Sequence, residues 1–119
     1  MASILTDIKK LFGISQSDKS FDTDLTIDIN SAFSVLTQLG VGPESGFVIT
    51  GSGEEWEEFI GDVETIELVK TYIFLKVKLM FDVSTLTSPM IESINRQVSE
   101  FEWRLNVAVD TKEPNEEGA

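Results

Sequence analysis

Segment 63–81 is apolar on two sides when it is wound as a helix, and this limits how the chain can fold. One row consists of Ile66, Val69, Ile73, Val77 and Met80, and the other of Leu68, Tyr72, Leu75 and Leu79. A surface helix needs only one apolar side, so a helix with two must be covered by other elements on both. The pattern therefore predicts a central helix ~28 Å long, at 1.5 Å per residue.

Two helices are expected before the central one. Residues 4–12 have their apolar side chains on one side, which predicts a short amphipathic arm with Lys9 in its last turn. Residues 25–39 carry apolar side chains every three or four positions, and Asp22 or Asp24 can cap the beginning of this helix. Each helix is followed by a glycine that can end it, Gly13 and Gly40.

The last helix is expected from Pro89 onward, because proline is tolerated in the first turn of a helix. Its apolar stripe consists of Ile91, Ile94, Val98, Phe101, Leu105 and Ala108. Trp103 and Val107 point the other way, beside Arg96. They are expected either to pack on the N-terminal arm or the 41–60 region, or to contact another subunit, since Trp and Arg are enriched at interface cores.

The stretch between the second and the central helix is the least helical part of the chain. Glycines bracket the β-type run Phe47, Val48 and Ile49, which predicts a strand edge or an extended loop that projects from the bundle. Residues 54–60 then predict about two helical turns, with glutamates at the positive N-terminal end.

These elements predict an all-α fold with a single domain over residues 1–109. The domain is a small bundle of four to five helices around segment 63–81, with an extended glycine-bounded loop. From residue 110 the composition changes to Lys, Glu, Pro, Asn and Gly, which predicts an acidic C-terminal tail, 110–119, that is flexible or bound to a partner.

Charge and composition exclude several classes of function. Nine Lys and Arg against 21 Asp and Glu give a formal net charge of −12, which repels nucleic acid phosphates and anionic membranes. The chain has no Cys and no His, so thiolate and imidazole metal sites and thiol nucleophiles are absent. No apolar run reaches the ~20 residues of a bilayer span. We expect a soluble protein made in the cytoplasm.

Two groups of carboxylates could be drawn as metal or general-acid sites: Asp22, Asp24 and Asp28, and Glu54, Glu55, Glu57 and Glu58. Aspartates at a helix start are more often caps or solvated charges, and no EF-hand spacing follows them. The glutamates suit a solvated helix face better than a paired-carboxylate active site, which needs a pocket to shift one pKa. No glycine-rich phosphate-binding motif is present. We expect no enzymatic activity and no cofactor.

Five short motifs are spread over most of residues 1–109: Phe21-Asp22-Thr23-Asp24, Ile29-Asn30-Ser31-Ala32-Phe33, Gln38-Leu39-Gly40-Val41-Gly42-Pro43, Val69-Lys70-Thr71-Tyr72 and Phe101-Glu102-Trp103-Arg104-Leu105-Asn106. In their order and spacing they resemble the head-tail connector (adaptor) proteins of long-tailed bacteriophages or prophages. The resemblance implies a helical subunit that forms a ring, typically of twelve, beneath the portal protein. It also implies a head-closure or tail-completion protein on the opposite side, a central channel through which DNA passes without specific binding, and a place in the virion neck after assembly in the host cytoplasm.

The resemblance suggests three groups of contact residues. Subunit-interface candidates are Phe47, Val48, Ile49, Arg96, Trp103 and Val107. Portal-binding candidates, by analogy with connectors whose C-terminal segment engages the portal, are Val109, Asp110, Thr111, Lys112, Glu113, Pro114 and Asn115. Channel-facing candidates are Glu54, Glu55, Glu57 and Glu58, whose charge repels DNA so that the duplex slides, although acidity for solubility explains them at least as well.

The alternative function is that of a small acidic helical protein that acts by protein-protein binding, as a regulator or an assembly chaperone. A regulator of the antitoxin kind more often carries a basic DNA-reading element, which is absent here. A scaffolding protein is better matched by a long heptad pattern and a highly polar composition.

Overall fold

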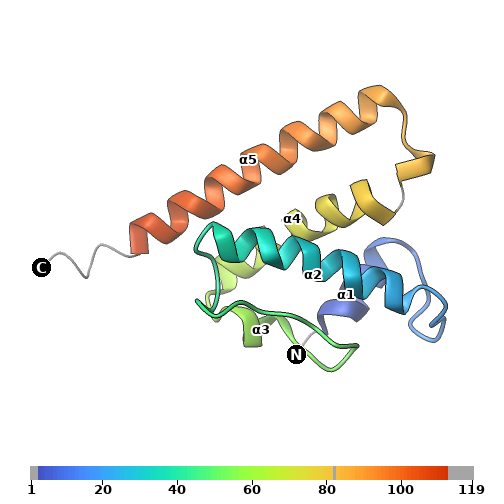
Figure 1. Cartoon of the computed structure of the whole chain (residues 1–119), viewed down its shortest axis with the longest axis horizontal. Helices are drawn as coiled ribbons and strands as arrows, with labels where there is room; N and C mark the ends of the chain where they lie inside the picture. The colour runs from blue at the N-terminus through green and yellow to red at the C-terminus, as the bar shows by residue number, and fades with distance from the viewer. Residues whose placement is uncertain (1–2, 82, 113–119) are drawn as a thin grey trace, which may run out of the picture.

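The computed structural model describes residues 3–81 and 83–112 as a bundle of helices (Figure 1). The elements are α1 (Ile4–Leu11), α2 (Asp22–Gln38), α3 (Trp56–Phe59), α4 (Val63–Phe81), a 3-10 turn η1 (Val83–Thr85) and α5 (Ser88–Lys112). Within these described ranges there is no β-strand, and Ser3 and Glu55 form an isolated β-bridge. The predicted all-α fold is confirmed.

Helix α4 lies between α2 and α5 and packs against both, with α1 as a further neighbour (Figure 1). In the first predicted row, Ile66, Val69, Ile73 and Val77 are buried. In the second row, Tyr72 and Leu75 are buried. Each large apolar side chain buried in this way contributes about 1.5–3 kcal/mol. The central position of segment 63–81, predicted from its two apolar sides, is confirmed, and its bounds are the predicted ones.

A glycine ends α2 in the way the sequence indicates. Gly40 has φ of 86°, a left-handed conformation that glycine adopts without steric cost. Its N–H donates to the carbonyl of Thr37, and the N–H of Val41 donates to the carbonyl of Leu36. This pair of bonds is the Schellman arrangement, and both Val41 and Leu36 are buried beneath it.

The beginning of α2 differs from the prediction. The residue that precedes the helix is Phe21, and no side chain caps it, so neither Asp22 nor Asp24 is a cap. Asp22 instead pairs with Lys9 of α1, whose ammonium lies 2.8 Å from Oδ1. Lys9 is only 3% exposed and also donates to the carbonyl of Gln16. The Asp22 carboxylate therefore neutralises a buried ammonium instead of capping α2, the role expected from the sequence.

The glycine-bounded loop does not project from the bundle, contrary to expectation. Nδ2 of Asn30 donates to the carbonyl of Ile49 at 3.0 Å, and the N–H of Ile49 donates to Oδ1 of Asn30 at 2.8 Å. The Phe47 ring packs edge-on against Phe33 and Phe59, with centroids 5.1 and 5.4 Å away. The run is extended, but its partner is a side-chain amide of α2 rather than a second strand.

Segment 54–60 makes one helical turn, α3, instead of the two predicted. Glu55 and Glu58 form a capping box at its beginning, and Ile60 is already extended. The Trp56 indole is buried, and its Nε1–H donates to Asp7 of α1 at 2.8 Å. The single turn ends at Phe59, and the Trp56 indole at its beginning connects it to α1.

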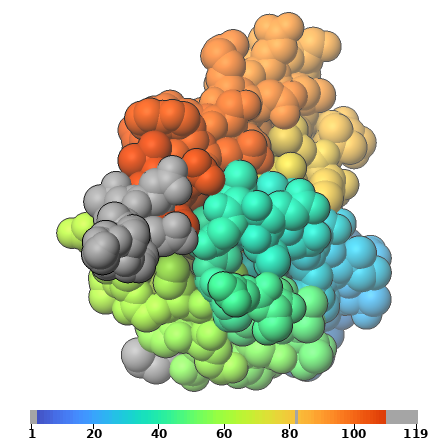
Figure 2. Space-filling model, turned by 60° about the vertical axis from the view of Figure 1, so that its left-hand side comes forward, coloured from blue at the N-terminus to red at the C-terminus, as the bar shows by residue number. Residues whose placement is uncertain are grey.

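Helix α5 begins at Ser88, with Pro89 in its first turn, and it runs through Lys112. The buried members of its apolar stripe are Ile94, Val98 and Leu105. Helix α5 continues past the expected start of the tail at residue 110, through residues 110–112, and residues 113–119 lie outside the described part. In the last turns Asn106 donates to the carbonyl of Leu39, which places the end of α5 beside α2 (Figure 2).

Candidate functional site

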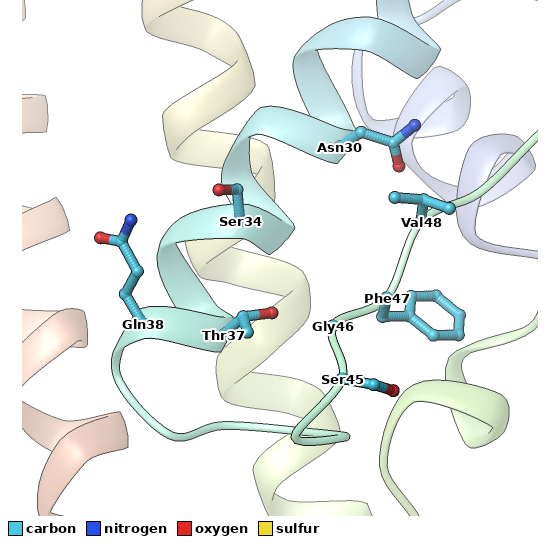
Figure 3. A pocket seen from close by; sticks show the side chains of 8 residues that line it. All are labelled: Asn30, Ser34, Thr37, Gln38, Ser45, Gly46, Phe47 and Val48. Atoms are coloured by element: carbon cyan, nitrogen blue, oxygen red, sulfur yellow. The ribbon is translucent and has the colours of Figure 1, made fainter.

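Grooves on the described surface are shallow and offer little chemistry. One groove of about 390 Å³ lies between α2 and the loop at 45–48 (Figure 3). Its lining consists of Asn30, Ser34, Thr37, Gln38, Ser45, Gly46, Phe47 and Val48. None of these side chains titrates near neutral pH, so the groove has no general acid or base. Among the described residues there is also no group of three or more His, Cys, Asp or Glu placed to hold a metal ion.

The four glutamates assigned to a channel lie around α3. Burial opposes ionisation of Glu54, but hydrogen bonds from the main chain and hydroxyl of Thr50 outweigh it and lower the pKa of Glu54. Glu55 and Glu58 serve the capping box, and Glu57 is exposed. These carboxylates are arranged for local structure and surface charge, not as a pair that shares a proton.

The six interface candidates divide into two sets. Ile49 is buried in the core and Phe47 packs against it, so within the loop run only Val48, 62% exposed, is open to contact. On α5, Trp103 is 66% exposed and Val107 is exposed beside it. The expectation that Trp103 packs on the arm or the 41–60 region of its own chain is therefore wrong.

A second exposed apolar surface was missed by sequence reasoning. It is a groove of about 570 Å³ where α2 begins and α4 ends, lined by Phe21, Asp24, Ile27, Asp28, Met80 and Phe81. Ile27 is 59% exposed, and Phe21 and Met80 are exposed as well. Part of this surface is indicated by the sequence, because Phe21 and Ile27 are apolar residues that fall outside the apolar side of α2. Met80, in contrast, is predicted to belong to a buried row of α4. We call this surface the α2–α4 groove.

The α2–α4 groove carries an unbalanced negative charge. Burial raises the pKa of Asp28, and the nearby carboxylate of Asp24 raises it further. In residues 3–81 and 83–112 neither aspartate forms an ion pair with Lys or Arg. The groove thus combines exposed apolar side chains with carboxylates that are without a cation.

The predicted portal-binding segment divides at the end of α5. Val109 packs against the core, where it faces Gly40, and residues 110–112 belong to the helix. Glu113, Pro114 and Asn115 lie outside the described residues. The segment therefore begins as part of the bundle rather than as a separate tail.

None of the described helices is both long enough and apolar enough to cross a membrane. Neither a curated protein nor a solved structure matches the chain significantly. A family model described as phage connector protein matches residues 4–112, which includes every helix and almost the whole chain. The chain therefore belongs to the phage connector protein family, whose role is structural.

Proposed function

We propose that this chain is the head-tail connector (adaptor) subunit of a long-tailed phage or prophage, which forms a ring beneath the portal protein and joins the capsid to the tail. The family match over residues 4–112 carries this proposal. The exposure of Trp103 on a folded, well-packed chain supports it, because exposed aromatic side chains mark sites of protein association.

The proposed ring is of the cyclic, head-to-tail kind, in which each subunit uses two different surfaces. The chain exposes two such surfaces: the Trp103 side of α5 and the α2–α4 groove. The expected number of subunits, twelve, comes from the resemblance to connectors and not from these surfaces.

The proposed channel lets DNA pass without binding it. A formal net charge of −12 on each subunit makes the ring repel phosphates. Glu54, Glu55, Glu57 and Glu58 are the proposed channel-facing carboxylates, and Glu57 is the one among them that is exposed and outside the capping box. Their alternative role is to keep the protein soluble.

The proposed partners in the virion neck are the portal protein and a head-closure or tail-completion protein, with assembly in the host cytoplasm. Segment 109–115 is the proposed portal contact: residues 109–112 end α5, and the polar composition of residues 113–115 is typical of segments that dock on a partner. Removal of residues 113–119 deletes no residue of the described helices, and loss of portal attachment is the expected result.

The proposed function is tested by native mass spectrometry and negative-stain microscopy of the protein alone and co-purified with the portal protein of the same phage. A ring that caps the portal, formed with or without the portal present, is the expected result. No association at micromolar concentration and near-physiological salt in either sample overturns the proposal and favours a regulatory or chaperone role.

A further inference from the structure

We infer that the Trp103 side of α5 in one subunit docks into the α2–α4 groove of a second copy of this chain. The inference rests on the proposed ring and goes further, because it names the two surfaces that meet.

The α5 surface combines an apolar anchor with a free cation. Arg96, Trp103 and Val107 lie along one line of the helix, opposite the buried stripe, and all three are exposed. Arg96 forms no ion pair within the described residues, whereas Arg104 is paired with Glu100 at 3.0 Å. A tryptophan and an arginine are the residues most enriched at the energetic centre of interfaces.

The groove offers the complementary features. Phe21, Ile27 and Met80 provide an apolar surface, and methionine adapts its shape to a partner. Asp24 and Asp28 line it without a cation, and partial burial of Asp28 raises the pKa of its carboxyl. An arginine brought by a partner stabilises these carboxylates, while the indole covers the apolar part.

The two surfaces are placed for contact between copies rather than within one. The groove lies where α2 begins and α4 ends, toward the right of Figure 1, whereas the second half of α5 runs toward the left. When two copies join through two different surfaces, each end of the pair still has one unused surface. Further copies therefore add at the ends until a ring closes, or they form a filament. The geometry therefore assigns this contact to a second copy of the chain.

Disulfide trapping tests the contact directly, because the chain has no cysteine of its own. The double variant Ile27→Cys with Val107→Cys is assembled, with the portal protein where the ring requires it, and is oxidised mildly. A disulfide needs Cβ atoms about 3.5–4.5 Å apart, so trapping reports close contact. We expect a ladder of covalent multimers on a denaturing gel, and monomers only from either single variant.

Matched controls use other exposed valines. Val63→Cys with Val107→Cys places the second cysteine at the far end of α4 and gives monomers, since Val63 is exposed but distant from the groove. Val48→Cys with Val107→Cys tests the loop as the docking surface. A ladder from either control pair and none from the Ile27 pair overturns the inference.

Charge exchange gives a second test. Arg96→Asp and Asp24→Arg are each expected to weaken self-association about 10-fold or more, and their combination to restore it, because Asp24 lies one turn from Ile27 on the same side of α2 and the charges are exchanged across one contact. Lys10→Glu, an exposed cation on α1, is the control and leaves association unchanged. Unrestored association in the double variant overturns the pairing. If the wild-type chain forms a ring but the Ile27→Cys, Val107→Cys variant gives no ladder, the docking is refuted and the proposed ring is unaffected. The absence of any ring overturns both proposals.

Discussion

Asn30 of α2 holds the main chain of Ile49 through two hydrogen bonds, one to its carbonyl and one from its N–H. An amide side chain presents the same donor and acceptor as a peptide group, so Asn30 replaces the neighbouring strand that an extended segment normally has. Together with the packing of Phe47 and Ile49, this relationship keeps segment 47–49 against the bundle, and Val48 is its exposed residue.

Replacing Asn30 by Ala is expected to lower the free energy of unfolding by about 1–3 kcal/mol, because both main-chain groups of Ile49 lose their partner. Urea denaturation measures the change. Asn95→Ala is the matched control, an exposed amide on α5, and is expected to change stability by less than about 0.5 kcal/mol. Equal effects of the two substitutions contradict the role of Asn30.

Tyr72 in α4 donates its hydroxyl to Oε2 of Glu102 in α5 at 2.9 Å and is buried. Burial, together with the Glu102 carboxylate, raises the pKa of Tyr72 far above its ordinary value. The neutral phenol therefore stabilises the fold fully below a pH of about 10, and this stabilisation is lost as the pH rises further.

The free energy of unfolding of Tyr72→Phe is thus expected to be about 1–2 kcal/mol lower than that of the wild type at neutral pH. It is also expected to change less than that of the wild type when the pH is raised above about 10. Because Tyr72 is the only tyrosine in the chain, absorbance at alkaline pH reports on this group alone. Ionisation of Tyr72 at its ordinary pKa in the folded protein is the result that contradicts its burial.

The Lys9–Asp22 pair is expected to respond unequally to substitution of its two members. Lys9 is the more deeply buried, so Asp22→Asn leaves a buried ammonium without a counterion and costs about 3 kcal/mol. Lys9→Met keeps the packing and leaves a partly solvated carboxylate, at a smaller cost. Thermal unfolding measures both, with Lys10→Met as the exposed control; the reverse order shows that Lys9 reaches water.

Gly42→Ala is expected to destabilise the fold more than Gly13→Ala. Both glycines have positive φ, 85° and 76°, and the backbone strain of alanine there costs about 1–2 kcal/mol. At Gly42 an added Cβ also meets the Phe59 ring, whereas at Gly13 it meets open space. We expect a further cost of about 1–3 kcal/mol at Gly42. Equal melting temperatures of the two variants show that the ring moves aside freely.

Trp103→Ala is expected to weaken assembly and leave folding of the single chain unchanged within about 0.5 kcal/mol, because the indole is mostly exposed. Sedimentation measures assembly, and denaturation of the monomer measures folding. Trp56→Ala is the contrast, since this indole is buried and bonded to Asp7, and the substitution is expected to unfold or strongly destabilise the chain. An equal loss of stability in Trp103→Ala assigns that residue to the core.

The fold was largely predictable, because the helical spacing of apolar residues and the glycines that end helices are local features of the sequence. Segment 63–81 is the clearest case, since two apolar sides require neighbours on both, and the helix has the predicted bounds. The end of α2 at Gly40 followed from the same kind of reasoning. These features depend on residues close together in the chain.

The contacts that were missed join residues distant in sequence. Nothing near Lys9 indicates that the chain returns to cover it with Asp22, and nothing near Asn30 indicates that its amide meets Ile49. The α2–α4 groove is likewise formed by the beginning of α2 and the end of α4, about sixty residues apart, so no local pattern joins its two sides. The family was predictable for another reason: the sequence contains short motifs that resemble those of connector proteins, and the family model matches the chain.

The bond from Asn106 to the carbonyl of Leu39 has a mechanical consequence. The end of α5 is fastened to the corner where α2 ends, and Val109 packs there against the core. A force applied to the chain after Lys112 is therefore transmitted along α5 and resisted in shear by the long α4–α5 contact as well as by this corner. The C-terminal end of α5 is thus tied to the bundle in two places, along α4 and at the corner beside Leu39.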